Sequence, residues 1–189
     1  GSYLLARAYV EKRKTCPPFR KDVYGDSREM VETFGLLWSN PSALKSLQRN
    51  AQLGHPFLEK LLLTISGAHG TRSKTGPAGR QGVHRGLSAD DVGSLLQGQF
   101  GAAAEEEAPA LVFAQDYARK GGEPDAELLG QLVERYGAAA ARDIVTYVRV
   151  VRAASLLGNT FDAFCSRMLG QPAPDSTLRD ELSILSTFA

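Results

Sequence analysis

The chain has 189 residues, 43% of them hydrophobic, and its formal net charge at pH 7 is +1. This length predicts one domain with a sizeable core, and the charge argues neither for nor against a nucleic-acid partner. Every apolar run falls short of the ~20 residues that a membrane-spanning helix needs, so we expect a soluble protein without a membrane segment.

Cysteine is rare in this chain. Cys16 and Cys165 lie far apart and form no C-x-x-C pair, no metal-binding spacing and no disulfide framework. Few cysteines and no signal peptide favour a reducing compartment, either the cytoplasm or the interior of an organelle. Gly1 and Ser2 resemble an expression scar, so a native targeting segment could have preceded them.

Residues 1–25 are predicted to form an arm outside the core. A short helical stretch is followed by basic residues and by Pro17 and Pro18, which stop a helix and favour extended backbone. The arm could wrap a partner subunit, meet an anionic surface, or be a solvated tail.

Two helices are predicted after the arm. The first begins at Asp26, which has capping-box spacing to Glu29. Its apolar side holds Met30, Phe34 and Leu37, with Val31 and Trp38 beside them. The second begins at residues 40–41, where asparagine caps and proline is preorganised, and it ends at Gly54.

The next helix is predicted to begin at residues 55–56, a His-Pro pair. Its apolar stripe consists of Phe57, Leu58, Leu61, Leu62 and Ile65. Glu59 lies at the edge of this stripe and Lys60 lies outside it. The apolar helix then breaks into a loop of polar and ionisable residues.

The segment 76–85 contains three glycines, each costing about 0.5–1 kcal/mol in a helix interior relative to alanine. It is either a helix that tertiary contacts hold together, which we favour, or a loop. Ser88 and Asp91 then form a second capping box, and the helix that they begin runs to about Gln97.

The second half of the chain is predicted to be helical almost throughout. Residues 105–107, three glutamates, supply negative charge to the first turn of a helix that ends at residues 121–122. Asp125 begins another helix, which Gly137 ends. Residues 138–169 form the longest regular stretch, with a kink or a close helix approach at residues 158–159.

The last segment, 173–189, is predicted to be a tail helix whose apolar side is Leu178, Leu182 and Leu185. No stretch has convincing strand periodicity, because the β-branched run at 145–151 lies inside a longer helical pattern. The architecture is therefore all-α with about eight helices. It is divided into the arm 1–25, a helical domain 26–172 and the tail helix.

Residues 59–88 carry a spacing found in a known family. In the redox branch of the alkylhydroperoxidase D-like proteins, Glu is followed after eleven residues by Cys-x-x-Cys, then by His after three and Gly-Leu-Ser after seven. Counting back from the Gly-Leu-Ser at 86–88, the glutamate is Glu59, but the cysteine positions hold Thr71 and Lys74 and the histidine position holds Ala78. The chain resembles this family, which includes the carboxymuconolactone decarboxylases, over roughly residues 40–170.

The resemblance implies an alkylhydroperoxidase D-like helical bundle that assembles with itself as a trimer or hexamer. Whether the chain is an enzyme stays uncertain. Thiol peroxidase activity is not expected, because Thr71 cannot form a thiolate and Lys74 cannot form a disulfide. The carboxymuconolactone decarboxylases also lack the cysteine pair, but they are expected to keep a histidine that Ala78 removes here.

The remaining candidate site lies between Glu59 and Lys74. Glu59 could act as a general base if burial raised its pKa, with His69 as a proton relay and Lys74 or Arg72 binding an anionic substrate. Thr71 and Ser73 complete the predicted substrate-binding segment. Alternatively, Glu59 is a structural carboxylate paired with Arg72 or Lys74.

Other ligands find little support in the pattern. The three histidines, His55, His69 and His84, lack ligand spacing, so no metal is expected, and no motif indicates a cofactor. The basic residues of 72–85 could bind anions or nucleic acid in a symmetric oligomer, but without interleaved aromatics a solvated loop is the better reading and nucleic acid is not expected.

Two functions of different class follow. The first is a non-redox binding, scaffold or regulatory subunit of a homo-oligomer or a larger assembly. The second is an enzyme with a rebuilt acid–base site, of the lyase, decarboxylase or isomerase type, that acts on a small anionic metabolite.

Overall fold

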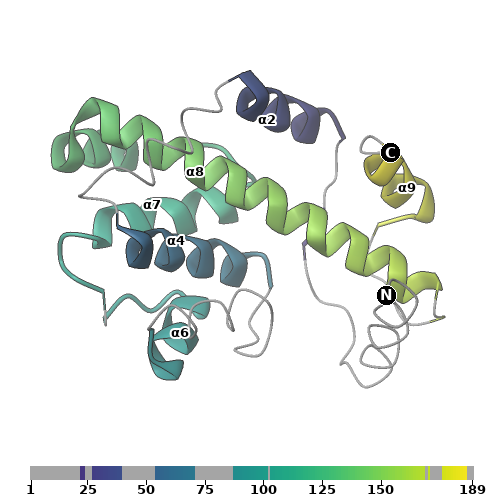
Figure 1. The fold of residues 1–189 in the computed structure, drawn as a ribbon, viewed down its shortest axis with the longest axis horizontal. Helices are drawn as coiled ribbons and strands as arrows, with labels where there is room; N and C mark the ends of the chain where they lie inside the picture. The colour runs from purple at the N-terminus through teal and green to yellow at the C-terminus, as the bar shows by residue number, and fades with distance from the viewer. Residues whose placement is uncertain are drawn as a thin grey trace. The chain divides into compact units, whose positions relative to one another are not determined.

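The computed structural model describes residues 22–23, 27–39, 54–70, 87–101, 103–168, 170 and 176–186. These residues form six α-helices and no strand (Figure 1). The helices are α2 (Ser27–Ser39), α4 (His55–Ala68), α6 (Ala89–Leu96), α7 (Ala108–Arg119), α8 (Ala126–Met168) and α9 (Leu178–Ser186). The all-α class is thereby confirmed for these ranges. The helix predicted at 40–53 and the glycine-rich segment 76–85 lie outside them.

The chain divides into two compact units, Val31–Ser155 and Gly1–Met30 together with Leu156–Ala189. The helix α8 supplies residues to both units. No helix in the described ranges combines the length and the apolar character that a bilayer crossing requires.

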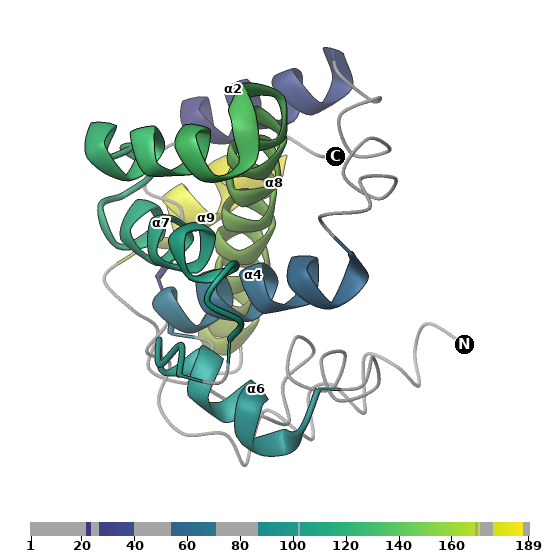
Figure 2. The same cartoon turned by 90° about the vertical axis from the view of Figure 1, so that its left-hand side faces the viewer.

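In the unit Val31–Ser155, α4 lies between α7 and α6 and packs against both (Figure 2). Its buried surface extends almost all round the helix and is therefore wider than the predicted stripe. Besides Leu58, Leu61 and Ile65, the side chains of Leu63 and Thr64 are also buried. A helix that is enclosed on all sides must satisfy its polar groups internally, and the Thr64 hydroxyl does so by donating to the carbonyl of Lys60 (2.9 Å).

A glycine allows α4 and α6 to approach closely. A Cβ atom added at Gly67 would lie 2.2 Å from the carbonyl oxygen of Leu96, so only glycine fits here. At its other end, α6 begins as predicted. The Ser88 hydroxyl accepts a hydrogen bond from the backbone N–H of Asp91 (3.0 Å).

The helix α7 differs from its prediction at its first turn. The three glutamates at 105–107 form a turn before the helix, and Glu107 is its N-cap residue. The Glu107 carboxylate instead forms an ion pair with Lys60 of α4. Phe113 and Tyr117, which the sequence pattern did not single out, stack against each other at 5.8 Å and are buried in the core.

The start of α8 follows its sequence signals. The Asp125 carboxylate accepts hydrogen bonds from the backbone N–H groups of Glu127 (3.0 Å) and Leu128 (3.2 Å), as an N-cap residue does. Gly137 has φ +79°, a left-handed conformation that interrupts the helix. The prediction that one helix ends here and a longer one begins is thus confirmed. At residues 158–159, where a kink or a close helix approach was predicted, the backbone is helical, because the non-helical backbone within α8 is confined to Gly137.

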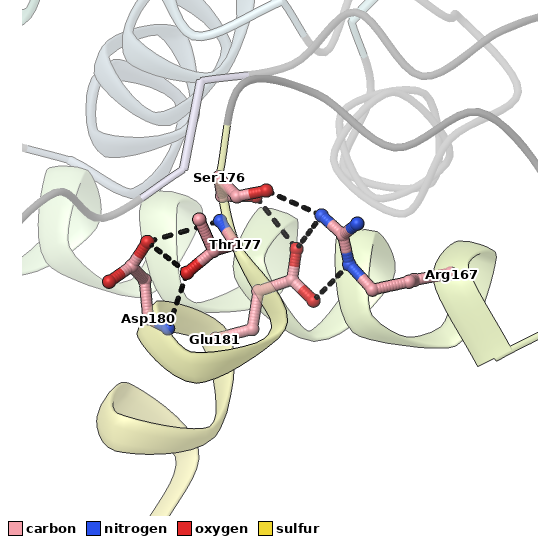
Figure 3. Close-up of polar contacts among 5 residues, drawn as sticks. All are labelled: Arg167, Ser176, Thr177, Asp180 and Glu181. Atoms are coloured by element: carbon pink, nitrogen blue, oxygen red, sulfur yellow. Dashed lines mark hydrogen bonds and ion pairs between the residues drawn. The ribbon is translucent and has the colours of Figure 1, made fainter.

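In the other unit, α9 packs one carboxylate and one large apolar side chain inward. Glu181 and Ile184 are buried, whereas Leu178 and Leu182 are exposed, so the predicted apolar side of the tail helix is wrong. Arg167 of α8 donates to both carboxylate oxygens of Glu181, at 3.2 and 3.1 Å (Figure 3). The Ser176 hydroxyl adds a third hydrogen bond to this carboxylate (2.7 Å). The inward side of α9 thus combines the ion pair of Glu181 with the buried side chain of Ile184, which the spacing of the leucines did not predict.

Candidate functional site

Glu59 lies in the second turn of α4 and is almost completely buried, with 3% of its surface exposed. The sequence placed it at the edge of an apolar stripe. The structure places it inside the core instead, because α6 and α7 both pack on this helix. An ionisable group is rarely buried this deeply without interactions that compensate for its lost hydration.

His69 is the C-cap residue of α4 and is 2% exposed. Its backbone N–H donates to the carbonyl of Ile65 (3.1 Å), which continues the helical pattern to the last turn. Gly70 follows with φ +84° and takes the chain out of the helix. His69 therefore lies at the point where the buried helix gives way to the predicted substrate-binding segment.

The two described candidates, Glu59 and His69, are well separated. Ten residues of α-helix span about 15 Å, so the two side chains are too far apart to exchange a proton directly. A relay from one to the other needs an intervening group. Lys74, the third predicted catalytic residue, and Thr71, Arg72 and Ser73, the predicted substrate-binding residues, lie outside the described residues.

A tyrosine of α8 contacts the backbone of α4 one residue before Glu59. The hydroxyl of Tyr147 donates to the carbonyl of Leu58, the residue immediately before Glu59 (3.2 Å). This hydrogen bond links α8 to the turn of α4 that carries Glu59. Tyr147 escaped the sequence reasoning because it lies in the β-branched run at 145–151. Its place next to Val148 and near Ile144, both on the buried side of α8, was the available signal.

A buried cation, Arg152, also lies in α8 and is 7% exposed. Its guanidinium group lies against Gly122, where an added Cβ would be 2.9 Å from Nη1. Gly122 has φ +96° and donates its backbone N–H to the carbonyl of Tyr117 (2.8 Å). Glycine is thus needed here both for the turn after α7 and for the space that Arg152 occupies.

The described residues were compared with the side-chain groups that bind metal ions. Among the described residues, no group of three histidine, cysteine, aspartate or glutamate side chains could hold a metal ion. Cys165 of α8 is half buried. Cys16 lies outside the described residues.

Comparison with protein-family models, with curated proteins and with solved structures gives no match to this chain. Function is therefore inferred from the burial of Glu59 and His69 on α4 and from the resemblance carried by residues 59–88.

Proposed function

We propose that the chain is a non-redox protein of the alkylhydroperoxidase D-like type, which acts as a binding, scaffold or regulatory subunit of a homo-oligomer. The observation that carries this proposal is the burial of Glu59 and His69 on α4, with 3% and 2% of their surfaces exposed. Groups that bind and turn over a substrate must reach it, whereas groups enclosed by packed helices act first on folding and specificity.

The replacement of the family's cysteine positions supports the same conclusion. Peroxide reduction needs a thiolate and a resolving thiol two residues further on. Thr71 and Lys74 offer neither. A chain that keeps the glutamate at residue 59 but loses the reactive thiols is better suited to holding a structure than to redox turnover.

The second candidate is an acid–base enzyme acting on a small anionic metabolite. It is favoured by the position of His69, which ends α4 two residues before Thr71. In this version Glu59 is the base, His69 the relay and Lys74 the group that holds the anion, while Thr71, Arg72 and Ser73 line the substrate. The separation of about 15 Å between Glu59 and His69 makes this the weaker candidate.

Native mass spectrometry of the purified full chain, combined with two variants at residue 59, tests the proposal. Wild type is expected to be a homo-oligomer. Glu59→Gln, which keeps the shape of the side chain, and Glu59→Ala are expected to change thermal stability or subunit count. A monomer at every concentration contradicts the proposal.

The enzyme alternative makes a different prediction for the same variants. A small anionic molecule retained by wild type and lost in Glu59→Gln, with helical content unchanged, would favour it. Turnover of that molecule by wild type but not by Glu59→Gln would replace the scaffold proposal with the enzyme.

A further inference from the structure

A polar cluster fastens the start of α9 to the last turn of α8 (Figure 3). The carboxylate of Glu181, which is completely buried, accepts hydrogen bonds from Nε and Nη2 of Arg167 (3.2 and 3.1 Å). It accepts a third from the hydroxyl of Ser176 (2.7 Å). Arg167 also donates to the backbone carbonyl of Ser176. We call Arg167, Ser176 and Glu181 the α9 clasp.

Apart from the α9 clasp, one buried side chain of α9 holds this helix in place. The helix has nine residues, and a helix shorter than about 12–15 residues is marginal in water by itself. Its buried residues are Glu181, which belongs to the clasp, and Ile184. A change that disrupts the hydrogen bonds of Glu181 is therefore expected to release α9.

Ser176 is the hydroxyl-bearing member of the clasp. Glu181 is completely buried, whereas Ser176 is half-buried and the side chain of Arg167 is 32% exposed. The Ser176 hydroxyl lies between opposite charges, because it donates to Glu181 and belongs to the residue whose carbonyl Arg167 contacts. A negative group on this oxygen therefore acts on both charged partners.

We infer that Ser176 is a phosphorylation site and that its phosphate releases α9 from α8. The phosphoryl donor is a nucleoside triphosphate bound to a protein kinase. A bond forms between Oγ of Ser176 and the γ-phosphorus, and the bond from that phosphorus to the oxygen bridging it to the β-phosphate breaks. The hydroxyl proton passes to a base of the kinase, and a nucleoside diphosphate leaves.

The phosphate reverses the electrostatics around Glu181. It removes the proton that Ser176 donates, and it places a charge of about −1.5 to −2 beside the buried carboxylate. It also offers Arg167 a competing acceptor whose oxygens suit a guanidinium group. A buried carboxylate that is repelled and loses its cation is costly, and release of α9 hydrates it.

The inference goes beyond the proposed homo-oligomer and does not depend on it, because all three residues of the clasp belong to one chain. A monomer whose α9 responds to phosphate would contradict the proposed function and leave this inference standing. An oligomer whose α9 does not respond would do the reverse.

The neighbouring hydroxyl provides a matched control. Thr177 is exposed, and its hydroxyl donates to the carboxylate of Asp180 (2.6 Å) and accepts from the Asp180 backbone N–H (3.2 Å). This hydroxyl belongs to the cap of α9 and not to the clasp. Asp180 is exposed too, so water screens its repulsion of a phosphate on Thr177.

Hydrogen exchange of the full chain, with phosphoserine incorporated at residue 176 during translation, tests the release. Amide exchange in residues 178–186 is expected to become roughly tenfold faster or more, while α4, α6 and α7 keep their protection. Phosphothreonine at residue 177, and Ser176→Ala, which removes the hydroxyl without adding charge, are each expected to have a smaller effect. Exchange that phosphoserine leaves unchanged, or that either control accelerates equally, overturns the inference.

The access of a kinase to Ser176 is tested on the native full chain. The kinase is one selected because it phosphorylates Ser176 in a synthetic peptide of residues 170–186. Mass spectrometry is expected to find Ser176 of the native chain modified at a rate within roughly tenfold of the peptide, since α9 opens locally. A slower rate, or modification that Ser176→Ala leaves in place, overturns the assignment of this site.

Discussion

At the scale of single residues, the most informative pair is Arg167 and Glu181. Glu181 is fully buried in the packed face of α9, and Arg167 approaches it from α8 with two hydrogen bonds (Figure 3). The hydrogen bond with Glu181 raises the pKa of Arg167 above its usual value. A buried carboxylate that loses its partner is costly, whereas replacing both partners with apolar groups is often nearly neutral.

Arg167→Met is expected to loosen α9, because it leaves the Glu181 carboxylate buried with its cation removed. Amide hydrogen exchange in residues 178–186 should become faster by about tenfold or more, while α4, α6 and α7 keep their protection. Arg179→Met, an exposed substitution on the same helix, is the control and should have little effect. The double variant Arg167→Met with Glu181→Leu should recover much of the protection. Unchanged exchange in Arg167→Met would show that the ion pair does not hold α9.

At the scale of helices, the contact between α4 and α6 depends on a single glycine. Gly67 lies inside α4, where alanine would be preferred by helix propensity alone. The carbonyl of Leu96 occupies the space of the missing side chain, so the tertiary contact reverses the local preference. The same contact brings the end of α4, with His69, against α6.

Gly67→Ala is expected to destabilise the protein by about 1–3 kcal/mol, since a backbone group cannot yield as a flexible side chain can. Gly130→Ala in α8 is expected to change stability in the opposite direction. Gly130 is exposed and has no neighbour within 4 Å, so alanine should stabilise by about 0.5–1 kcal/mol. Urea unfolding monitored by circular dichroism measures both changes. A stabilising Gly67→Ala would mean that α4 and α6 are less closely packed than the structure has them.

At the scale of the whole molecule, a few ionisable groups among the described residues contribute to how stability responds to pH. The hydrogen bond from Lys120 lowers the pKa of Asp125, assisted by the backbone N–H groups that Asp125 caps. The pKa of Asp180 is lowered in the same way, mainly by the Thr177 hydroxyl. In the opposite direction, the hydrogen bond with Asp125 raises the pKa of Lys120, and burial raises the pKa of Tyr136.

The sign of the pH response follows from these directions. The two aspartates have pKa values in the folded protein below the unfolded value of about 3.9. Their contribution to the free energy of unfolding is therefore present above that pH and is lost on acidification. The raised pKa values of Lys120 and Tyr136 give a contribution that is present below about pH 10 and is lost as the pH rises through the folded values. From these four groups we expect the free energy of unfolding to be constant near neutral pH and to fall at both acid and alkaline pH.

Asp125→Asn is expected to reduce the acid loss, because asparagine still caps α8 but carries no charge to be neutralised. The measurement is urea unfolding at a series of pH values from 3 to 7, with Glu123→Gln, an exposed substitution in the same loop, as the control. If the free energy of unfolding falls equally at acid pH in wild type and Asp125→Asn, groups other than Asp125 cause the acid loss of stability.

The sequence alone determined the helical class and several helix ends of this protein. Ser88, Asp125 and Gly137 act through their own backbone and that of near neighbours, so their effects can be recognised without a fold. It also singled out Glu59, at the edge of an apolar stripe and at the glutamate position of the family spacing, and His69, in the polar segment behind the same helix. Their burial was not predictable, because it depends on α6 and α7, which are distant in sequence.

Only the tertiary structure decided which sides of the helices face inward. Leucine periodicity pointed α9 in the wrong direction, since Glu181, paired with Arg167, and Ile184 are buried while Leu178 and Leu182 are exposed. Periodicity reports that a face is apolar, but whether that face is buried depends on what the rest of the fold places beside it.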